Sequence, residues 1–168
     1  MNLYLVRHGE AAPLGGTVQR DADRPLTQRG EKDVATIAGA LAAVDGEPAL
    51  ILTSPLARAM QTARIIATVM KVPPEIRATE NLSPGFRPKA LLAELTGLGA
   101  VKGVIAVGHQ PDLGGLIAYL VAEGSYVGLS IPPGAAACVV LGDSLAPGDT
   151  VLRWLLTADM VRRITTTT

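Results

Sequence analysis

The chain has 168 residues, in which fifteen Lys and Arg balance fifteen Asp and Glu for a formal net charge of zero. A chain of this length fits one domain, since domains of roughly 100 to 150 residues are the commonest, and we expect a single domain over residues 1–168. Zero net charge gives no overall field that would favour nucleic acid or an anionic membrane surface, so neither is expected as a partner.

Targeting and membrane segments are not expected either. The opening Met1–Val6 has no basic leader and is too short for the apolar core of a signal peptide. No apolar run reaches the roughly 20 residues needed to span a bilayer. The single cysteine, Cys138, lies in an apolar run and is expected to be a buried free thiol, which is compatible with a reducing compartment. We therefore expect a cytoplasmic protein.

Apolar runs and amphipathic stretches alternate along the first half of the chain. Thr27 can cap the first helix, and Ser54-Pro55 is typical of a helix start, with the hydroxyl as N-cap and proline at the first helical position. The expected elements are a strand at 3–6, a loop at 10–24, a helix at 28–44 closed by Asp45-Gly46, a strand at 49–53, a helix from 55 to 70 and a short edge strand near 75–78.

The second half continues the pattern until its end, where two strands follow each other. The expected elements are a loop at 84–88, a short helix at 89–95, a strand at 104–107, a helix at 112–123 stopped by Gly124, strands at 135–141 and 150–156, and a frayed end at 165–168. This order predicts an α/β fold, a three-layer sandwich with a mostly parallel central sheet, antiparallel edge strands and helices on both faces.

The two histidines of the chain each follow a predicted strand. His8 stands between Arg7 and Gly9, and His109 follows the strand at 104–107. The carboxyl ends of strands are where open α/β sheets bind ligands, so the two imidazoles are expected to share one site. Arg7 and His8 can meet one ligand only if the chain leaves strand geometry there, which Gly9 permits. The alternative is that both are structural histidines with satisfied hydrogen bonds.

A second arginine lies in the first turn of the helix that follows Ser54. A cation at a helix N-terminus is disfavoured by roughly 0.3 to 1 kcal/mol unless an anion offsets it, so Arg58 suits a bound phosphate or carboxylate. A solvated arginine is the alternative interpretation of Arg58 alone. Two arginines and two histidines at strand-to-helix junctions suit the binding and attack of a tetrahedral dianion.

Other kinds of site have less support. Histidine is a common metal ligand, but Arg7 disfavours a cation beside His8, and no His-x-x-x-His or cysteine pair completes a ligand set. The chain has no Gly-x-Ser-x-Gly nucleophile elbow and neither of the common glycine-rich nucleotide-binding motifs. We therefore expect no metal and no cofactor.

Four separated motifs resemble the histidine phosphatase superfamily, which includes cofactor-dependent phosphoglycerate mutases and acid phosphatases. They occur in the order of the family and cover almost the whole chain. The short length, Arg-His-Gly-Glu-Ala and Arg-Pro-Leu-Thr make the SixA branch of phosphohistidine phosphatases the most similar. The motifs are Leu5-Val6-Arg7-His8-Gly9-Glu10, Arg24-Pro25-Leu26-Thr27 with Gly30, Ser54-Pro55 with Arg58-Ala59 and Gln61-Thr62, and Val107-Gly108-His109.

The resemblance implies a role for each of these polar residues. His8 would be the nucleophile, Arg7, Arg58 and His109 would hold the phosphoryl group, and Arg24 would be an accessory phosphate contact. A neutral imidazole would attack phosphorus in line to give a phosphohistidine, and water would then hydrolyse this intermediate. The nearby arginines should keep His8 neutral by disfavouring imidazolium.

The proton donor to the leaving group is the least defined part of the site. Larger family members usually carry a glutamate or aspartate in a segment that here falls between residues 78 and 101. Glu80 is the candidate acid, and a solvated loop glutamate is the alternative. A phosphohistidine substrate would need less help, because its P–N bond breaks readily once the imidazole is protonated.

The resemblance predicts a phosphatase that prefers phosphohistidine of a phosphorylated protein, since the short middle segment leaves the site open. A broad small-molecule phosphomonoesterase, acting on small phosphomonoesters, and a non-catalytic phosphate-binding regulatory module are the alternatives. Mutase activity is the least expected, because the segment that would recognise phosphoglycerate is short.

Overall fold

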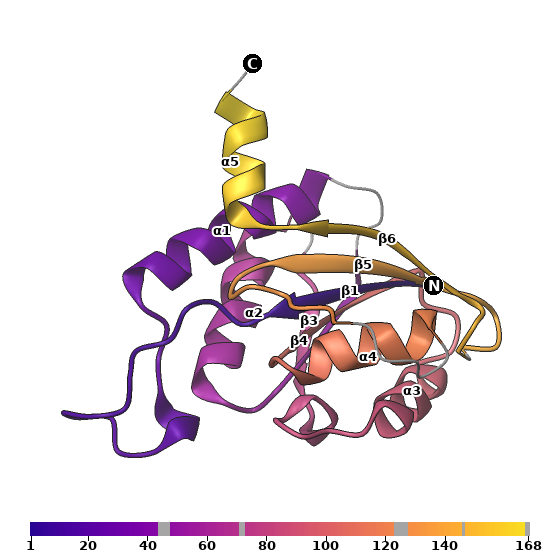
Figure 1. Cartoon of the computed structure of the whole chain (residues 1–168), viewed down its shortest axis with the longest axis horizontal. Coiled ribbons are helices and arrows are strands. Elements are labelled where there is room, and N and C mark those ends of the chain that lie inside the picture. Colours follow the sequence, from indigo (N-terminus) through magenta and orange to yellow (C-terminus); the bar gives the residue numbers. More distant parts are fainter. Residues whose placement is uncertain (44–47, 71–72, 123–127, 146, 167–168) are drawn as a thin grey trace.

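A computed structural model describes residues 1–43, 48–70, 73–122, 128–145 and 147–166. Its strands form one sheet in the order β3-β2-β4-β1-β5-β6 (Figure 1). The strands are β1 (Asn2–Arg7), β2 (Leu50–Thr53), β3 (Glu75–Ala78), β4 (Gly103–Gly108), β5 (Ala136–Leu141) and β6 (Thr150–Leu156).

The first four strands are parallel, and the last two add an antiparallel pair. β1 pairs with β4, β4 with β2, and β2 with β3, all in parallel. β5 runs antiparallel to β1, and β6 runs antiparallel to β5. The mostly parallel sheet is therefore confirmed, although the strand that opposes its neighbours, β5, lies one place inside the edge. The carboxyl ends of β1, β2 and β4 meet on one side of the sheet.

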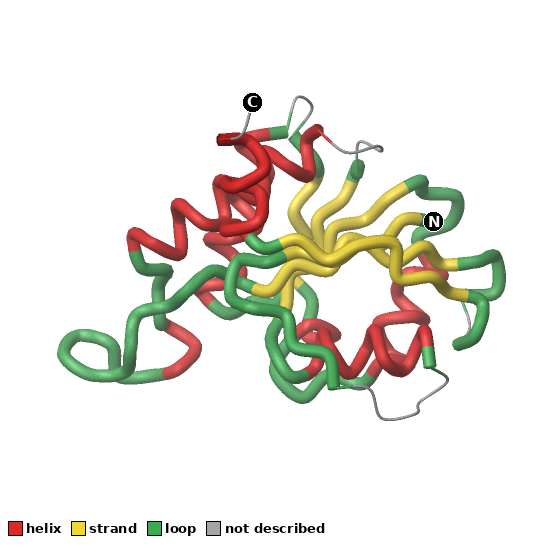
Figure 2. The backbone as a smooth tube through the Cα atoms, turned by 45° about the horizontal axis from the view of Figure 1, so that its top comes forward, coloured by secondary structure: helices red, strands yellow, loops and turns green. Residues whose placement is uncertain are grey.

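Helices cover both faces, as a three-layer sandwich requires. α1, α2 and α5 lie on one face of the sheet, and α3 and α4 lie on the other (Figures 1 and 2). The helices are α1 (Gln28–Ala43), α2 (Ala57–Val69), α3 (Pro88–Gly97), α4 (Asp112–Val121) and α5 (Ala158–Thr166), with short 3-10 turns η1 (Asp21–Asp23) and η2 (Glu80–Leu82).

Strand β1 shows why the runs in the sequence are continuously apolar. Leu3 and Leu5 pack in the core beneath α3 and α4, whereas Tyr4 and Val6 pack in the core beneath α1 and α2. Successive side chains of a strand point to opposite faces, so a strand covered on both sides buries every residue. Each fully buried side chain of this size contributes about 1.5 to 3 kcal/mol, which fixes the strand and the residues at its end.

Two helices differ from the expectation. α2 begins at Ala57 instead of Pro55, with Leu56 at its N-cap; the Ser54 hydroxyl accepts from the Leu56 amide at 3.4 Å and lies 2.9 Å from His109 Nε2. α5 was not expected, since Ala158 is its one buried residue among those described. It extends through Thr166, where fraying was expected. The predicted ends at residues 44–46, 123–124 and 167–168 lie outside the described residues.

Candidate active site

The two histidines lie side by side at the ends of neighbouring strands. The parallel register pairs Arg7 of β1 with Gly108 of β4, so His8 and His109 are the next residues on adjacent chains. The amide of His8 donates to the Gly108 carbonyl at 3.1 Å, and the two ring centroids are 4.9 Å apart. The structure therefore brings both imidazoles into one site, as the positions of the strand ends indicated.

A close approach of two backbones holds the loop that follows His8. The amide of Gly9 donates to Thr62 Oγ1 at 3.1 Å, and a Cβ at Gly9 would lie 2.8 Å from the Gly30 carbonyl oxygen. A Cβ at Gly30 would in turn collide with the backbone of Glu10. Both positions therefore require glycine, and the first turn of α1 fixes the direction in which the chain leaves His8.

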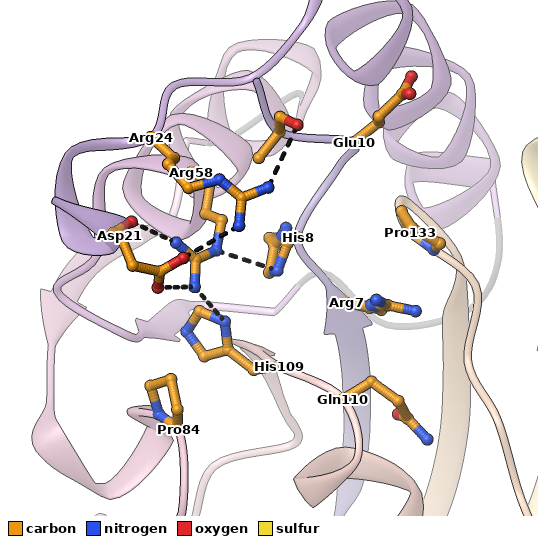
Figure 3. A pocket seen from close by; sticks show the side chains of 11 residues that line it. Arg7, His8, Glu10, Asp21, Arg24, Arg58, Pro84, His109, Gln110 and Pro133 are labelled. Carbon is orange, nitrogen blue, oxygen red and sulfur yellow. Dashed lines mark hydrogen bonds and ion pairs between the residues drawn. The ribbon is translucent and has the colours of Figure 1, made fainter. Parts of the chain in front are cut away.

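Arg58 of α2 connects the two histidines. The residue as a whole is 5% exposed. Its Nε donates to His8 Nε2 at 3.2 Å, and its Nη2 lies 3.5 Å from His109 Nδ1 (Figure 3). Nη1 and Nη2 also donate to Asp21, to the backbone oxygen at 2.7 Å and to Oδ2 at 2.9 Å. The guanidinium at the start of α2 is thus paired with a carboxylate, the kind of anion expected beside a cation at a helix N-terminus.

These contacts define the tautomer of His8. The guanidinium of Arg58 can only donate, so His8 Nε2 is the accepting nitrogen and carries a lone pair. The proton then belongs to Nδ1, which donates to the Gly9 carbonyl at 2.7 Å. The lone pair of Nε2 therefore points to Arg58, and both side chains line the same cavity.

Burial keeps both imidazoles neutral. It lowers the pKa of His8 from 6.5 to about 4, against the opposing effect of the Gly9 carbonyl and with a further contribution from Arg58. It also lowers the pKa of His109 to about 3, and the charge of Arg58 again adds to the effect. A neutral imidazole is the form that can act as a nucleophile.

Arg7 lies on the opposite wall of the same cavity from Arg58. Its Nη1 donates to the Ile131 carbonyl at 2.9 Å, and its side chain points toward the β5 side of the site (Figure 3). Arg7 Nε is buried and has no hydrogen-bond partner among the described residues. A buried donor without a partner is costly, so this wall suits a ligand that accepts hydrogen bonds.

Asp21 and Arg24 enter the site from the loop between β1 and α1. Asp21 Oδ1 lies 2.9 Å from Arg24 Nη1, while its Oδ2 binds Arg58. Arg24 Nε donates to the Ala12 carbonyl at 2.6 Å. The sequence predicted Arg24 but missed Asp21, since an acidic residue in a loop without periodicity carries no signal of its partners. Its spacing of three from Arg24 was the one available hint.

The cavity has a volume of about 420 Å³, and all but one of the predicted site residues line it. Those that do are Arg7, His8, Arg24, Arg58 and His109. Glu80 does not line it: its carboxylate accepts a hydrogen bond from Ser83 Oγ at 2.6 Å in η2. The carboxylates that do line the cavity are Asp21 and Glu10, and Glu10 Oε2 lies 3.2 Å from Thr27 Oγ1.

The cationic side chains give the cavity the character of an anion site. In the described part of the chain, no group of three or more His, Cys, Asp or Glu side chains is placed to hold a metal ion.

The searched residues also contain no helix long and apolar enough to cross a membrane. Cys138 is buried, and burial raises the pKa of its thiol. Arginine and neutral histidine are therefore among the groups that the cavity offers to a ligand.

Comparisons with known proteins agree with this geometry. The model of the histidine phosphatase superfamily (branch 1) matches residues 3–82. An uncharacterized protein of Picosynechococcus sp. is 40% identical over 116 residues, which cover 68% of this chain and 69% of that protein.

Solved structures of phosphatases share the fold. The protein histidine phosphatase SixA complexed with tungstate has a TM-score of 0.84 and 26% identity, covering 95% of this chain and 98% of that chain. The α-ribazole phosphatase of Shigella flexneri has a TM-score of 0.68 and 20% identity, covering 94% and 97%. A phosphoserine phosphatase mutant of Entamoeba histolytica in complex with phosphoserine has a TM-score of 0.68 and 18% identity, covering 95% and 98%.

Proposed function

The chain belongs to the histidine phosphatase superfamily, and from this premise we propose that it hydrolyses phosphohistidine on a protein through a phosphohistidine intermediate at His8, without a metal. The observation that carries the proposal is the contact between Arg58 Nε and His8 Nε2 at 3.2 Å, in a cavity also lined by Arg7 and His109. It joins a neutral nucleophile to a cation that can bind the phosphoryl oxygens.

In the first step, the lone pair of His8 Nε2 attacks phosphorus in line with the leaving group. The phosphoryl group enters between Nε2 and the guanidinium of Arg58, and its oxygens accept hydrogen bonds from Arg58 and Arg7. The ring of His8 gains positive charge as the P–N bond forms. The Gly9 carbonyl, which accepts from Nδ1, stabilises that charge.

In the second step, water attacks the phosphorus of the intermediate. The P–N bond to His8 breaks, and its electron pair returns to Nε2. The ring is then neutral again with its proton still on Nδ1, so His8 needs no proton donor to leave. Both protons of the water depart with the phosphate, as H₂PO₄⁻. Arg58 and Arg7 bind the same oxygens as in the first step, which lowers both barriers.

The proposed preference for phosphohistidine rests on the leaving group. Glu80, the acid expected from the sequence, does not line the cavity. An alcohol or a phenol leaves as an anion unless an acid protonates it, whereas a protonated phosphohistidine ring leaves as neutral imidazole. The cavity walls at Pro84 and Pro133 are exposed, which suits a side chain presented by another protein. The similarity to the SixA structure supports the same substrate class.

A small-molecule phosphomonoesterase is the second candidate, because the fold is also that of α-ribazole and phosphoserine phosphatases. The test measures phosphate release from a phosphohistidine protein, free phosphohistidine and an aryl phosphate, with and without EDTA. We expect the phosphohistidine protein to be the best substrate, EDTA to have no effect, and His8→Ala to abolish release. Undiminished activity of His8→Ala, or no release from any substrate by the wild type, contradicts the proposal.

A further inference from the structure

Asp21 introduces a negative charge into a cavity that otherwise suits an anion. Its carboxylate binds Arg58 Nη2 and Arg24 Nη1, each at 2.9 Å. The side chain of Arg58 is 6% exposed, but that of Asp21 is 51% exposed and lines the cavity. The carboxylate therefore remains accessible to a substrate while it contacts the guanidinium that faces His8.

Asp21 is not suited to donate a proton. The hydrogen bond from Arg24 holds the pKa of its carboxyl below the usual value of 3.8, and Arg58 acts in the same direction. The group is therefore ionised at neutral pH. Glu10, the other carboxylate of the cavity, is directed away from the two histidines and toward α1 (Figure 3). The cavity thus presents a fixed anion beside the reacting groups, and its other carboxylate points away from them.

A carboxylate at this place opposes the binding of a phosphate dianion and the departure of an anionic leaving group. It favours a leaving group that carries positive charge. We infer that Asp21 selects phosphoryl donors with a cationic leaving group, such as the phosphoimidazolium of phosphohistidine, and discriminates against phosphate esters. This inference rests on the proposed phosphatase function and deepens it by assigning the choice of substrate to one residue.

The reaction balances without a proton donor. The substrate ring is phosphorylated on one nitrogen and protonated on the other, so it is cationic. A bond forms between His8 Nε2 and phosphorus while the substrate P–N bond breaks, and the electron pair of that bond goes to the departing nitrogen. The ring leaves as neutral imidazole with its N–H. Asp21 stabilises the cationic ring before the bond breaks, which keeps the reactive protonated form bound.

The test compares two substrates in one variant. Asp21→Asn removes the charge and keeps the size of the side chain. We expect the ratio of kcat/KM for phosphohistidine to kcat/KM for an aryl phosphate to fall about tenfold, an effect near that of a unit charge about 4 Å away in bulk water, because half of the Asp21 side chain is exposed to solvent. Asp21→Glu restores the charge and should keep the ratio within about threefold of the wild type.

Asp23→Asn is the matched control, because it removes the same charge from the same 3-10 turn. Asp23 pairs with Arg20 at 2.7 Å, and neither side chain lines the cavity. This variant should leave the ratio unchanged. Inorganic phosphate gives a second measurement: Asp21→Asn should bind it several-fold more tightly than the wild type or Asp23→Asn, since an opposing charge has been removed.

The outcomes separate the inference from the proposed function. An equal loss on both substrates, with unchanged phosphate affinity, would mean that Asp21 only positions Arg58, and the inference would be wrong. A wild type inactive on both substrates, or an active His8→Ala, would overturn the proposed function. In that case unchanged phosphate affinity of Asp21→Asn would also overturn the charge effect, whereas tighter binding would support it.

Discussion

The two sides of the cavity are built in different ways. His8 and His109 follow buried parallel strands in fixed register, and Arg58 begins a helix packed against them. Asp21 and Arg24 come from the loop between β1 and α1, part of which reaches outward from the body of the molecule (Figures 1 and 2). The first side holds the groups proposed to bind and attack the phosphoryl group. The second presents the negative charge of Asp21, which is proposed to select the leaving group.

The largest expected effect comes from removing one arginine from each side. Arg58→Ala should lower kcat/KM by about 10³-fold, because it removes the guanidinium that contacts both histidines. Arg24→Ala should lower it by about tenfold, because Arg24 lines the cavity but its guanidinium contacts Asp21 and neither histidine. Steady-state kinetics on phosphohistidine would measure both. Equal losses would contradict the division between the two sides.

The pH dependence of activity tests the first, buried side of the cavity, which holds His8, His109 and Arg58. The pKa of His8 is lowered to about 4, so kcat/KM should lose no activity to protonation of His8 on going from pH 8 to pH 5 and should fall near pH 4. Arg58→Ala should move this limb to higher pH, since the charge of Arg58 contributes to the shift. A limb near pH 6.5 in the wild type would show that His8 is not desolvated.

The same shift predicts how stability changes with pH. In the unfolded chain histidine has a pKa near 6.5, and in the folded chain that of His8 is about 4. The unfolded state therefore binds more protons between these values, and the contribution of His8 is complete above pH 6.5 and is lost as pH falls toward 4. Urea unfolding of the wild type and His8→Asn over this range would measure it. Parallel curves for the two proteins would contradict the prediction.

Two glycines of α1 provide a matched test of the loop closure. Gly30→Ala should destabilise the fold by about 1 to 3 kcal/mol and reduce activity, because the new Cβ collides with the backbone of Glu10. Gly39→Ala, with no atom within 4 Å of its Cβ, should stabilise the protein by about 0.5 to 1 kcal/mol. Urea denaturation measures both. A neutral Gly30→Ala would show that the backbones of residues 10 and 30 separate easily.

The smallest effect is expected at Glu80. Its carboxylate accepts from Ser83 and lies outside the lining of the cavity. Glu80→Gln should therefore change kcat/KM on phosphohistidine by less than about twofold, as expected for a substitution of a surface residue. A loss of tenfold or more would show that η2 moves Glu80 to the leaving group during turnover.

The sequence predicted the buried side, with its two histidines, better than the exposed side formed by the loop between β1 and α1. The reasons are physical. Apolar runs ending at Arg7 and Gly108 indicate parallel strands, and parallel strands bring His8 and His109 to one edge. Asp21 has no comparable signal, because its partner Arg58 is 37 residues away in the chain. Such a contact depends on how a loop without periodicity folds back over the sheet.

The start of α2 failed to match the expectation for a related reason. Ser54-Pro55 has the local chemistry of a helix start, yet the hydroxyl of Ser54 lies 2.9 Å from the ring of His109. The hydroxyl also accepts from the Leu56 amide at 3.4 Å, so it caps the turn before α2 and not the first turn of the helix. α5 was missed because few of its residues are buried: Ala158 is buried, Val161 packs partly buried against the core, and Arg162 forms an ion pair with Asp33.

The hydrogen bond from His8 Nδ1 to the Gly9 carbonyl determines the regiochemistry of the proposed intermediate. With Nδ1 occupied at 2.7 Å, the nitrogen open to the cavity is Nε2. The phosphorylated enzyme should therefore carry the τ isomer of phosphohistidine and none of the π isomer. Trapping the enzyme with a phosphoryl donor and reading the ³¹P resonance of the modified ring would distinguish these isomers without reference to any substrate protein.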